Sequence, residues 1–205
     1  MNFIGISQRL IENESYFELR EALSTDWGKL FNENPLFKGF LPLPLSTQLP
    51  FEKYASVLSG VILSGGNDLA IFNKSLSSKL RDEYEMRLIK TCKSLNLPLL
   101  GVCRGAQIIA HFFKSKLAPC QNHTNLHEIE NEAFRVNSFH NYAILNLGNE
   151  LECIFKSKDN FIEAFKHRQL QIYALMWHIE RENGLNELSV LKAWLEAVKK
   201  YKGRK

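Results

Sequence analysis

The chain is organised around residues 97–110, which read Leu-Pro-Leu-Leu-Gly-Val-Cys-Arg-Gly-Ala-Gln-Ile-Ile-Ala. The first half is a short apolar run after a proline, which is typical of a buried strand. From Arg104 onward apolar residues recur at helical spacing, namely Ile108, Ile109, Phe112 and Phe113. Cys103 is therefore expected at a strand-to-helix turn.

Gly101 and Gly105 stand two positions on either side of this cysteine and leave room for a tight turn. The pattern is the thiol form of the nucleophile elbow, in which the side chain projects above the sheet and the next backbone N–H faces a developing oxyanion. The positive end of the following helix favours thiolate. The alternative is a buried structural cysteine beside ordinary turn glycines. The motifs further along the chain favour the elbow.

Composition indicates a soluble globular protein. The 205 residues are 45% hydrophobic and 23% charged, which suits one domain spanning residues 1–205 with an ample core. The net charge of +4 permits an anionic substrate, and the absence of a basic tract argues against nucleic-acid binding.

The four cysteines form no Cys-x-x-Cys pair, and a chain of this size needs no disulfide scaffold. The N-terminus lacks the pattern of a signal peptide, and no window is long and apolar enough to span a membrane. We therefore expect a cytoplasmic protein without a membrane anchor. The sequence leaves a homodimer open.

Strands and helices alternate through the first half of the chain. Periodicity predicts strands at 3–6, 58–63 and 97–102 and helices at 14–31, 78–95 and 104–113. The prolines of residues 40–45 allow at best an edge strand there. This alternation predicts an α/β fold with a parallel sheet and helices on its faces, whose active site lies at the carboxyl ends of the strands.

The second half predicts strand leading into loop at 134–140 and a hairpin of strands 151–155 and 161–165 around Asp159-Asn160. A last apolar strand is predicted at 170–177, followed by a closing amphipathic helix at 187–201.

Two further strand ends carry groups that suit acyl chemistry. Ser64-Gly65-Gly66 follows the strand at 58–63 and offers bare backbone N–H groups to an oxyanion, although an isolated glycine pair is usually only a tight turn. His178 and Glu180 follow the last strand, and residues two apart on an extended chain point to the same side. A Cys103 nucleophile, a His178 base and an orienting Glu180 would form a triad, whereas a lone histidine is more often a core or surface residue.

Cys120, His123 and His127 have a spacing that resembles a zinc site. No fourth partner stands nearby in the sequence, and a loop rich in Asn and Gln is poor scaffolding for such a site. We therefore expect no metal and no cofactor.

These features together resemble the class I glutamine amidotransferase superfamily, and within it the free-standing γ-glutamyl hydrolase branch. The resemblance runs from residue 1 to about residue 182 and rests on five motifs. They are Leu63-Ser64-Gly65-Gly66, Arg81-Asp82-x-x-Glu85, Pro98-x-x-Gly101-Val102-Cys103-Arg104-Gly105-x-Gln107, Val136-Asn137-Ser138-Phe139-His140 and Trp177-His178-Ile179-Glu180.

The resemblance implies a flavodoxin-like, mostly parallel sheet and a Cys103-His178-Glu180 triad that cleaves a γ-glutamyl amide of a small-molecule substrate through a thioester. It also implies an oxyanion hole from backbone near Gly66 and Arg104. Contacts to the glutamyl moiety are implied for Gly65, Gln107, Asn137, Ser138 and Phe139. Two positions depart from the family pattern, since Ile179 replaces the usual proline of His-Pro-Glu and Ser64 stands where proline is common.

Three classes of protein compete with a free-standing hydrolase. A glutaminase subunit that supplies ammonia would need a separate synthetase partner. A catalytically inactive binding module would have lost a triad member, and a thiol-dependent deglycase would carry a Glu that is not found beside Cys103. The basic residues Arg9, Arg104 and Arg168, near predicted loops, suit a diphosphate leaving group.

Overall fold

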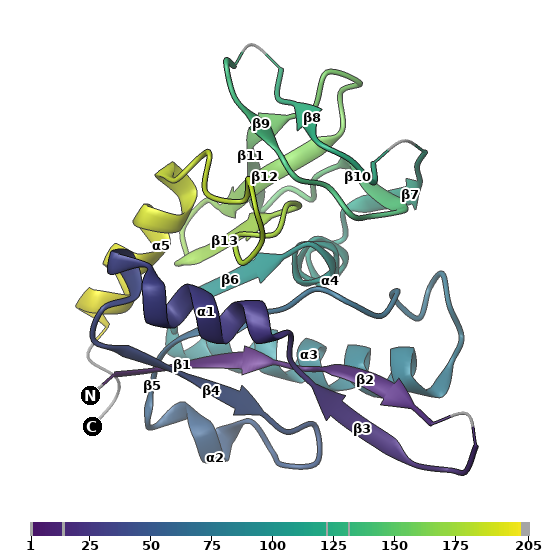
Figure 1. The fold of residues 1–205 in the computed structure, drawn as a ribbon, viewed down its shortest axis with the longest axis vertical. Coiled ribbons are helices and arrows are strands. Elements are labelled where there is room, and N and C mark those ends of the chain that lie inside the picture. Colours follow the sequence, from purple (N-terminus) through teal and green to yellow (C-terminus); the bar gives the residue numbers. More distant parts are fainter. Residues whose placement is uncertain (1, 14, 122, 131, 202–205) are drawn as a thin grey trace.

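A nine-stranded sheet forms the centre of the computed structural model, which describes residues 2–13, 15–121, 123–130 and 132–201. The strand order is β4-β1-β5-β6-β13-β12-β10-β7, and β11 pairs with β12 (Figure 1). These strands are β1 (Asn2–Ser7), β4 (Phe40–Leu45), β5 (Leu58–Leu63), β6 (Leu99–Val102), β7 (Lys116–Pro119), β10 (Tyr142–Asn146), β11 (Leu151–Lys156), β12 (Ile162–His167) and β13 (Ile172–Leu175).

The strands β4, β1, β5, β6 and β13 run parallel to one another, which confirms the predicted α/β fold. Beyond β13 the sheet continues antiparallel through β12, β10 and β7. The predicted hairpin at 151–165 is the antiparallel pair of β11 and β12. The carboxyl ends of β5, β6 and β13 meet at one edge of the parallel part, where the predicted site residues follow them.

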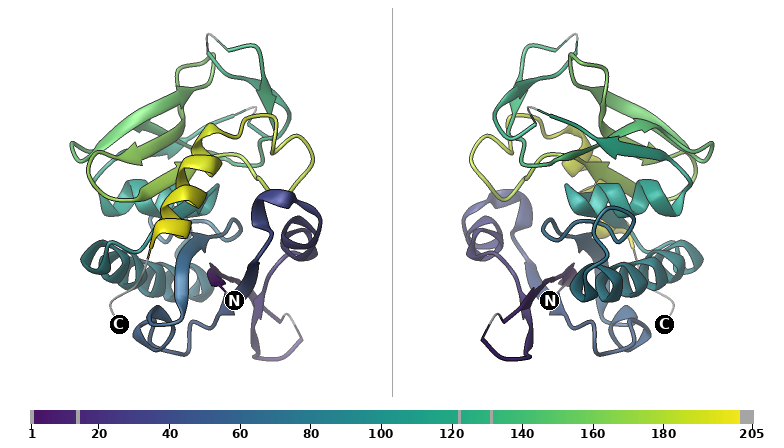
Figure 2. Two further views of the ribbon diagram at one scale, coloured as in Figure 1. Left: turned by 90° about the vertical axis from the view of Figure 1, so that its left-hand side faces the viewer. Right: turned by 90° about the vertical axis from the view of Figure 1, so that its right-hand side faces the viewer.

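Helices cover both faces of the sheet (Figure 2). On one face, α3 (Leu76–Leu95) and α4 (Arg104–Phe112) pack against Val61 and Leu63. On the other, α1 (Thr25–Glu33) and α5 (Ser189–Lys200) pack against Ile62. Successive side chains of β5 thus face opposite layers, so both faces of this strand are buried and its sequence is continuously apolar. A short helix α2 (Glu52–Ala55) and a 3-10 turn η1 (Pro35–Phe37) complete the helical elements.

The helix predicted over 14–31 is wrong in its first half. Its first residue, Glu14, lies outside the described residues, and the chain around it forms an antiparallel hairpin of β2 (Arg9–Glu12) and β3 (Leu19–Ala22). Helix α1 begins only at Thr25, because the Ser24 side chain accepts a hydrogen bond from the Asp26 N–H and caps the helix. Phe17, expected on a buried helical face, is 87% exposed.

Strands β7 and β10 and the small pair β8 (His127–Glu128) and β9 (Arg135–Val136) lie where the sequence predicted loop or made no prediction, apart from the strand expected near 134. Within the described part of the chain, no helix is long and apolar enough to cross a membrane.

Gly105 lies where α4 crosses β5, and a Cβ atom there would overlap the carbonyl oxygen of Leu63. We predict that Gly105→Ala lowers the free energy of unfolding by roughly 1–3 kcal/mol, because rigid backbone has to move apart. Urea denaturation measures this. Gly28→Ala is the matched control, since that helical glycine has no atom within 4 Å of the added methyl and should gain about 0.5–1 kcal/mol. Equal effects of the two substitutions would contradict the packing argument.

Candidate active site

Cys103 occupies a strained turn between β6 and α4. Its backbone angles are φ 53° and ψ −107°, a region that non-glycine residues seldom adopt. The turn is held because the Cys103 N–H donates to the Leu175 carbonyl at 2.8 Å and the Gln107 N–H donates back to the Cys103 carbonyl at 3.1 Å. The residue therefore stands at the strand-to-helix turn that the sequence predicted.

His178 and Glu180 come together directly after β13. The Nδ1 atom of His178 lies 2.7 Å from Oε1 of Glu180, and both side chains are buried. The segment is a turn and not the extended strand that the sequence predicted, with the Arg181 N–H donating to the His178 carbonyl at 3.3 Å. Ile179, the residue that replaces proline, is 1% exposed and packs into the core beneath.

The side chain of Cys103 lies close enough to the imidazole of His178 to affect its proton affinity. Burial alone disfavours the charged imidazolium, but the interactions with Cys103 and Glu180 outweigh it and raise the pKa of His178 to about 9. The three predicted triad residues therefore lie in one connected group in which His178 is held between a thiol and a carboxylate.

The Gly65-Gly66 loop packs directly against this group. A Cβ atom at Gly65 would lie 2.6 Å from Cε1 of His178, so only glycine lets the loop approach the ring. Gly66 has a φ of 96°, which also favours glycine. Arg81 donates to the carbonyl oxygens of Ser64 and Gly65 at 2.7 and 3.0 Å and so fixes the loop from behind.

The side chain of Arg104 belongs to a buried ion-pair group. Its guanidinium contacts the carboxylates of Asp82 and Glu85, and Glu85 also accepts from Arg81 at 3.0 Å. The side chain of Arg104 is 2% exposed, so its charge is compensated by these carboxylates and not by solvent or a ligand. Only its backbone N–H, at the start of α4, suits the oxyanion role that the sequence predicted.

The residues predicted to contact substrate take different positions. Asn137 donates to the backbone carbonyls of His178 and Glu182 and accepts from the His178 N–H, so its amide orients the histidine. Ser138 is 1% exposed and donates to the His123 carbonyl. Gln107 donates to the Tyr142 carbonyl at 3.0 Å, whereas Phe139 is 49% exposed with its ring 5.6 Å from that of His178.

A cavity of about 390 Å³ opens in front of Cys103. Gly66, Gln107 and Phe139, all predicted site residues, contribute to its wall. Sequence reasoning missed most of the polar lining, which comprises Asn67, Asp68, Asn73, Ser75, Ser77, Ser78, His140, Asn141 and Tyr142. The run Asn67-Asp68 directly after the glycine pair was the available signal, since polar residues after a strand end face the same edge as the site.

Of the three arginines expected near a diphosphate group, only Arg9 has a side chain placed for that role. It lines the cavity at Cys103 and a smaller one at His178, beside Gly66. Arg104 is committed to its ion pairs, and Arg168 lies away from the cavity, where it donates to the Asn149 carbonyl.

The chain is similar to several known proteins. The sequence profile of the family Glutamine amidotransferase class-I matches residues 44–198. A curated protein of Campylobacter jejuni subsp. jejuni serotype O:2, named gamma-glutamyl-CDP-amidate hydrolase, is 54% identical over 96% of this chain and 99% of its own length.

Two solved structures share the fold. A Thermoplasma acidophilum protein, assigned provisionally to GMP synthase as one of its subunits, aligns with a TM-score of 0.73 and 18% identity over 98% of this chain and 96% of its own. A glutamine amidotransferase from Thermotoga maritima aligns with a TM-score of 0.63 and 20% identity over 97% of this chain and 82% of its own.

The contact between His178 and Glu180 gives a prediction about proton affinity. Replacement of Glu180 by Gln removes a charge that favours the imidazolium, so the pKa of His178 is expected to fall below about 9. Titration of the histidine Cε1 protons by NMR measures the shift, with the resonance of His111 on α4 as internal reference. An unchanged His178 pKa would show that Glu180 does not act on the ring.

Proposed function

Because the chain belongs to the class I glutamine amidotransferase family, we propose that it is a cysteine-dependent γ-glutamyl hydrolase. Its proposed substrate is γ-glutamyl-CDP-amidate, and the products are L-glutamate and cytidine diphosphoramidate. The observation that carries this proposal is the 54% identity, over nearly the full length of both chains, to the Campylobacter hydrolase of that name. The group formed by Cys103, His178 and Glu180 supports the same chemistry.

In the first step the Cys103 thiolate attacks the γ-carbonyl carbon of the substrate. The carbonyl oxygen becomes an oxyanion, which the backbone N–H groups of Gly66 and Arg104 stabilise at about 3 kcal/mol per donor. Collapse of this intermediate forms the γ-glutamyl thioester and breaks the carbon–nitrogen bond. The imidazolium of His178 gives its proton to the departing nitrogen.

In the second step the now neutral His178 removes a proton from water. The resulting hydroxide adds to the thioester carbonyl, the thiolate leaves, and glutamate is released. Glu180 holds the tautomer in which Nδ1 carries the proton and Nε2 faces the reacting atoms. His178 thus serves once as acid and once as base in each turnover.

Arg9 is proposed to bind the diphosphate of the leaving group. It lines the same cavity as Cys103, and its side chain packs on the loop that carries Gly66. A guanidinium makes paired hydrogen bonds to phosphate oxygens, so this position would select a nucleotide-bearing leaving group over ammonia.

The nucleophile is tested by replacing Cys103 with Ala. We expect the release of glutamate to fall by roughly 10³-fold or more, since a triad without its nucleophile retains little activity. Cys153→Ala is the matched control, because that cysteine is exposed and outside the cavity. Acid quenching of the active enzyme with substrate, followed by mass spectrometry, should reveal a γ-glutamyl adduct on Cys103. Substantial turnover by the Cys103→Ala variant would rule out the thioester.

The leaving group is tested by comparing L-glutamine, γ-glutamyl-γ-aminobutyrate and γ-glutamyl-CDP-amidate as substrates of one enzyme preparation. We expect the nucleotide substrate to be preferred, and Arg9→Gln to lower its kcat/KM by about 10- to 100-fold through loss of charge-assisted hydrogen bonds. The values for the other two substrates should hardly change. Preference for L-glutamine would instead indicate a glutaminase that supplies ammonia to a partner, and an equal loss on all three substrates would contradict the role of Arg9.

A further inference from the structure

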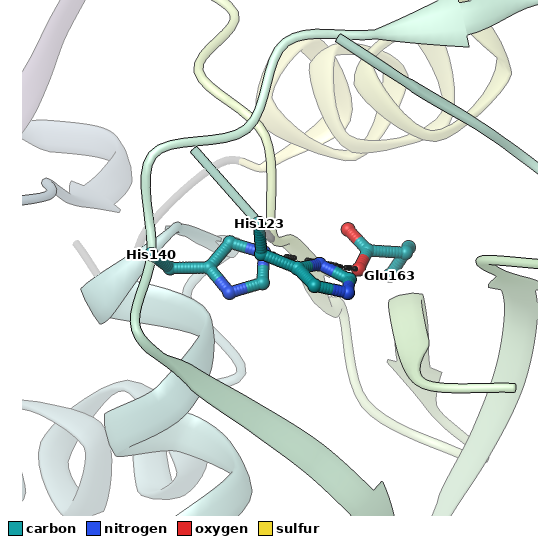
Figure 3. Close-up of side chains that lie close together, drawn as sticks. All are labelled: His123, His140 and Glu163. Carbon is teal, nitrogen blue, oxygen red and sulfur yellow. Dashed lines mark ion pairs between the residues drawn. The ribbon is translucent and has the colours of Figure 1, made fainter. Parts of the chain in front are cut away.

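A second group of ionisable side chains lies apart from the triad, around the carboxylate of Glu163 on β12. Nδ1 of His123 and Nε2 of His140 lie 3.6 and 3.8 Å from Oε1 of Glu163, and Nε2 of His127 lies 3.3 Å from Oε2. Figure 3 shows the rings of His123 and His140 beside this carboxylate. We call these four residues the histidine cluster.

The histidine cluster is largely buried. The side chains of Glu163, His123 and His140 are 1–3% exposed, and that of His127 is 15% exposed. Both carboxylate oxygens of Glu163 and the facing nitrogens of all three histidines are buried without a hydrogen-bond partner. Buried polar atoms are rarely left unpaired, and a buried carboxylate needs a compensating positive charge. A cation or protons must therefore lie among these atoms.

The far side of the His123 ring indicates which nitrogen can bind a cation. Its Nε2 lies 2.8 Å from Oδ2 of Asp159, and an ionised carboxylate only accepts hydrogen bonds, so Nε2 carries the proton. In a neutral ring Nδ1 then presents its lone pair to Glu163. A ligating histidine held from behind by a carboxylate is the usual arrangement at protein metal sites.

Protonation of the three histidines would compensate the charge of Glu163 but would itself be unfavourable. The ring of His123 lies 4.7 Å from that of His127 and 4.9 Å from that of His140, so three imidazolium charges would repel one another at short range. One divalent cation held by neutral His123, neutral His140 and Glu163 gives their facing atoms a partner, and His127 can then donate a hydrogen bond to the second carboxylate oxygen.

The spacing suits zinc. Bonds of about 2.0–2.1 Å in tetrahedral geometry place neighbouring ligand atoms roughly 3.3 Å apart. Nδ1 of His123 and Nε2 of His140 lie 3.6 and 3.8 Å from Oε1 of Glu163, slightly further than this spacing. Imidazole-rich sites favour zinc and its transition-metal neighbours, whereas calcium and magnesium prefer oxygen ligands.

We propose that His123, His140 and Glu163, whose ligand atoms all lie within 4.8 Å of one another, bind one Zn²⁺ ion, while His127 faces the other oxygen of the carboxylate. The sequence favoured no metal because no fourth partner stands near His123 and His127 in the chain. The fold supplies His140 and Glu163 from the β9–β10 loop and from β12. Cys120, the third member of the sequence pattern, is no ligand, since its Sγ faces Nδ1 of His140 at 3.8 Å on the other side of that ring.

The proposed ion would fix the loop that orients the triad. His140 ends the segment Asn137-Ser138-Phe139, and its backbone N–H donates to the His123 carbonyl at 2.9 Å. Asn137 holds the backbone of His178 through two hydrogen bonds, and the same amide also donates to the Glu182 carbonyl. Zinc would therefore tie the loop to β12 and stabilise the position of the catalytic histidine without touching substrate.

The test uses the full chain carrying Cys103→Ala, so that zinc bound by the thiol of the triad does not contribute. After removal of metal with a chelator, reloading with Zn²⁺ and gel filtration, we expect about one equivalent of zinc per chain and a raised Tm. Glu163→Gln and His123→Gln in the same background should each lose most of this zinc. The matched control is His111→Gln, which removes a histidine of α4 outside the histidine cluster and should keep the full equivalent.

Co²⁺ provides a second measurement that does not depend on whether the ligand variants fold. In the Cys103→Ala chain, tetrahedral cobalt bound by nitrogen and oxygen ligands gives visible d–d bands without a thiolate charge-transfer band. Retention of little or no zinc by this chain would overturn the proposal. So would a thiolate band, or zinc retained equally by the Glu163→Gln, His123→Gln and His111→Gln chains.

Discussion

The carboxylate of Glu85 is the point on which the active-site edge of the sheet depends. It accepts from Ser7 at the end of β1, from Arg81 on its own helix and from Arg104 at the start of α4. Arg81 and Glu85 are both fully buried. A charge at this depth is tolerated only with complete pairing, so the segments that supply its partners are constrained to one arrangement.

That arrangement joins the two halves of the proposed oxyanion hole. Arg81 binds the carbonyls of the Gly65 loop, while the neighbouring guanidinium of Arg104 anchors the first turn of α4 behind the nucleophile. The backbone N–H groups of Gly66 and Arg104 are thus held by one shared network of charges. The guanidinium of Arg104 is paired with Asp82 and Glu85, which explains why it is not free to bind a leaving group.

The sequence predicted the parallel part of the fold and the local motifs of the site, because each depends on residues that are close together in the chain. The turn around Cys103 and the pairing of His178 with Glu180 belong to this class. The helix expected at 14–31 was wrong in its first half because the helical spacing of the later residues Trp27, Leu30 and Phe31 was extended back over a segment whose hairpin is set by pairing with β2. Ser24, a good capping residue, marked the true start of α1.

What could not be predicted was how side chains from distant segments use their polar groups. Asn137 was expected to contact substrate, yet its partners on His178 lie 41 residues away. The same holds for His140 and Glu163, which join His123 and His127 only through the antiparallel extension of the sheet. Spacing along the chain can identify candidate ligands that are close together in the sequence. The remaining candidates come from segments that only the tertiary structure brings near.

The prolines of β4 have a consequence for assembly. This strand ends the sheet, and Pro42 and Pro44 pair with Ile4 and Ile6 of β1. Since proline has no N–H, the donors of the ladder come from the alternate residues, and the two proline positions fall on the outward side. The outer edge of β4 therefore lacks backbone N–H donors at the two proline positions, where an added strand would need them. Extension of the sheet through β4 by a second copy of the chain is therefore disfavoured, because an added strand would lose two hydrogen bonds of the ladder.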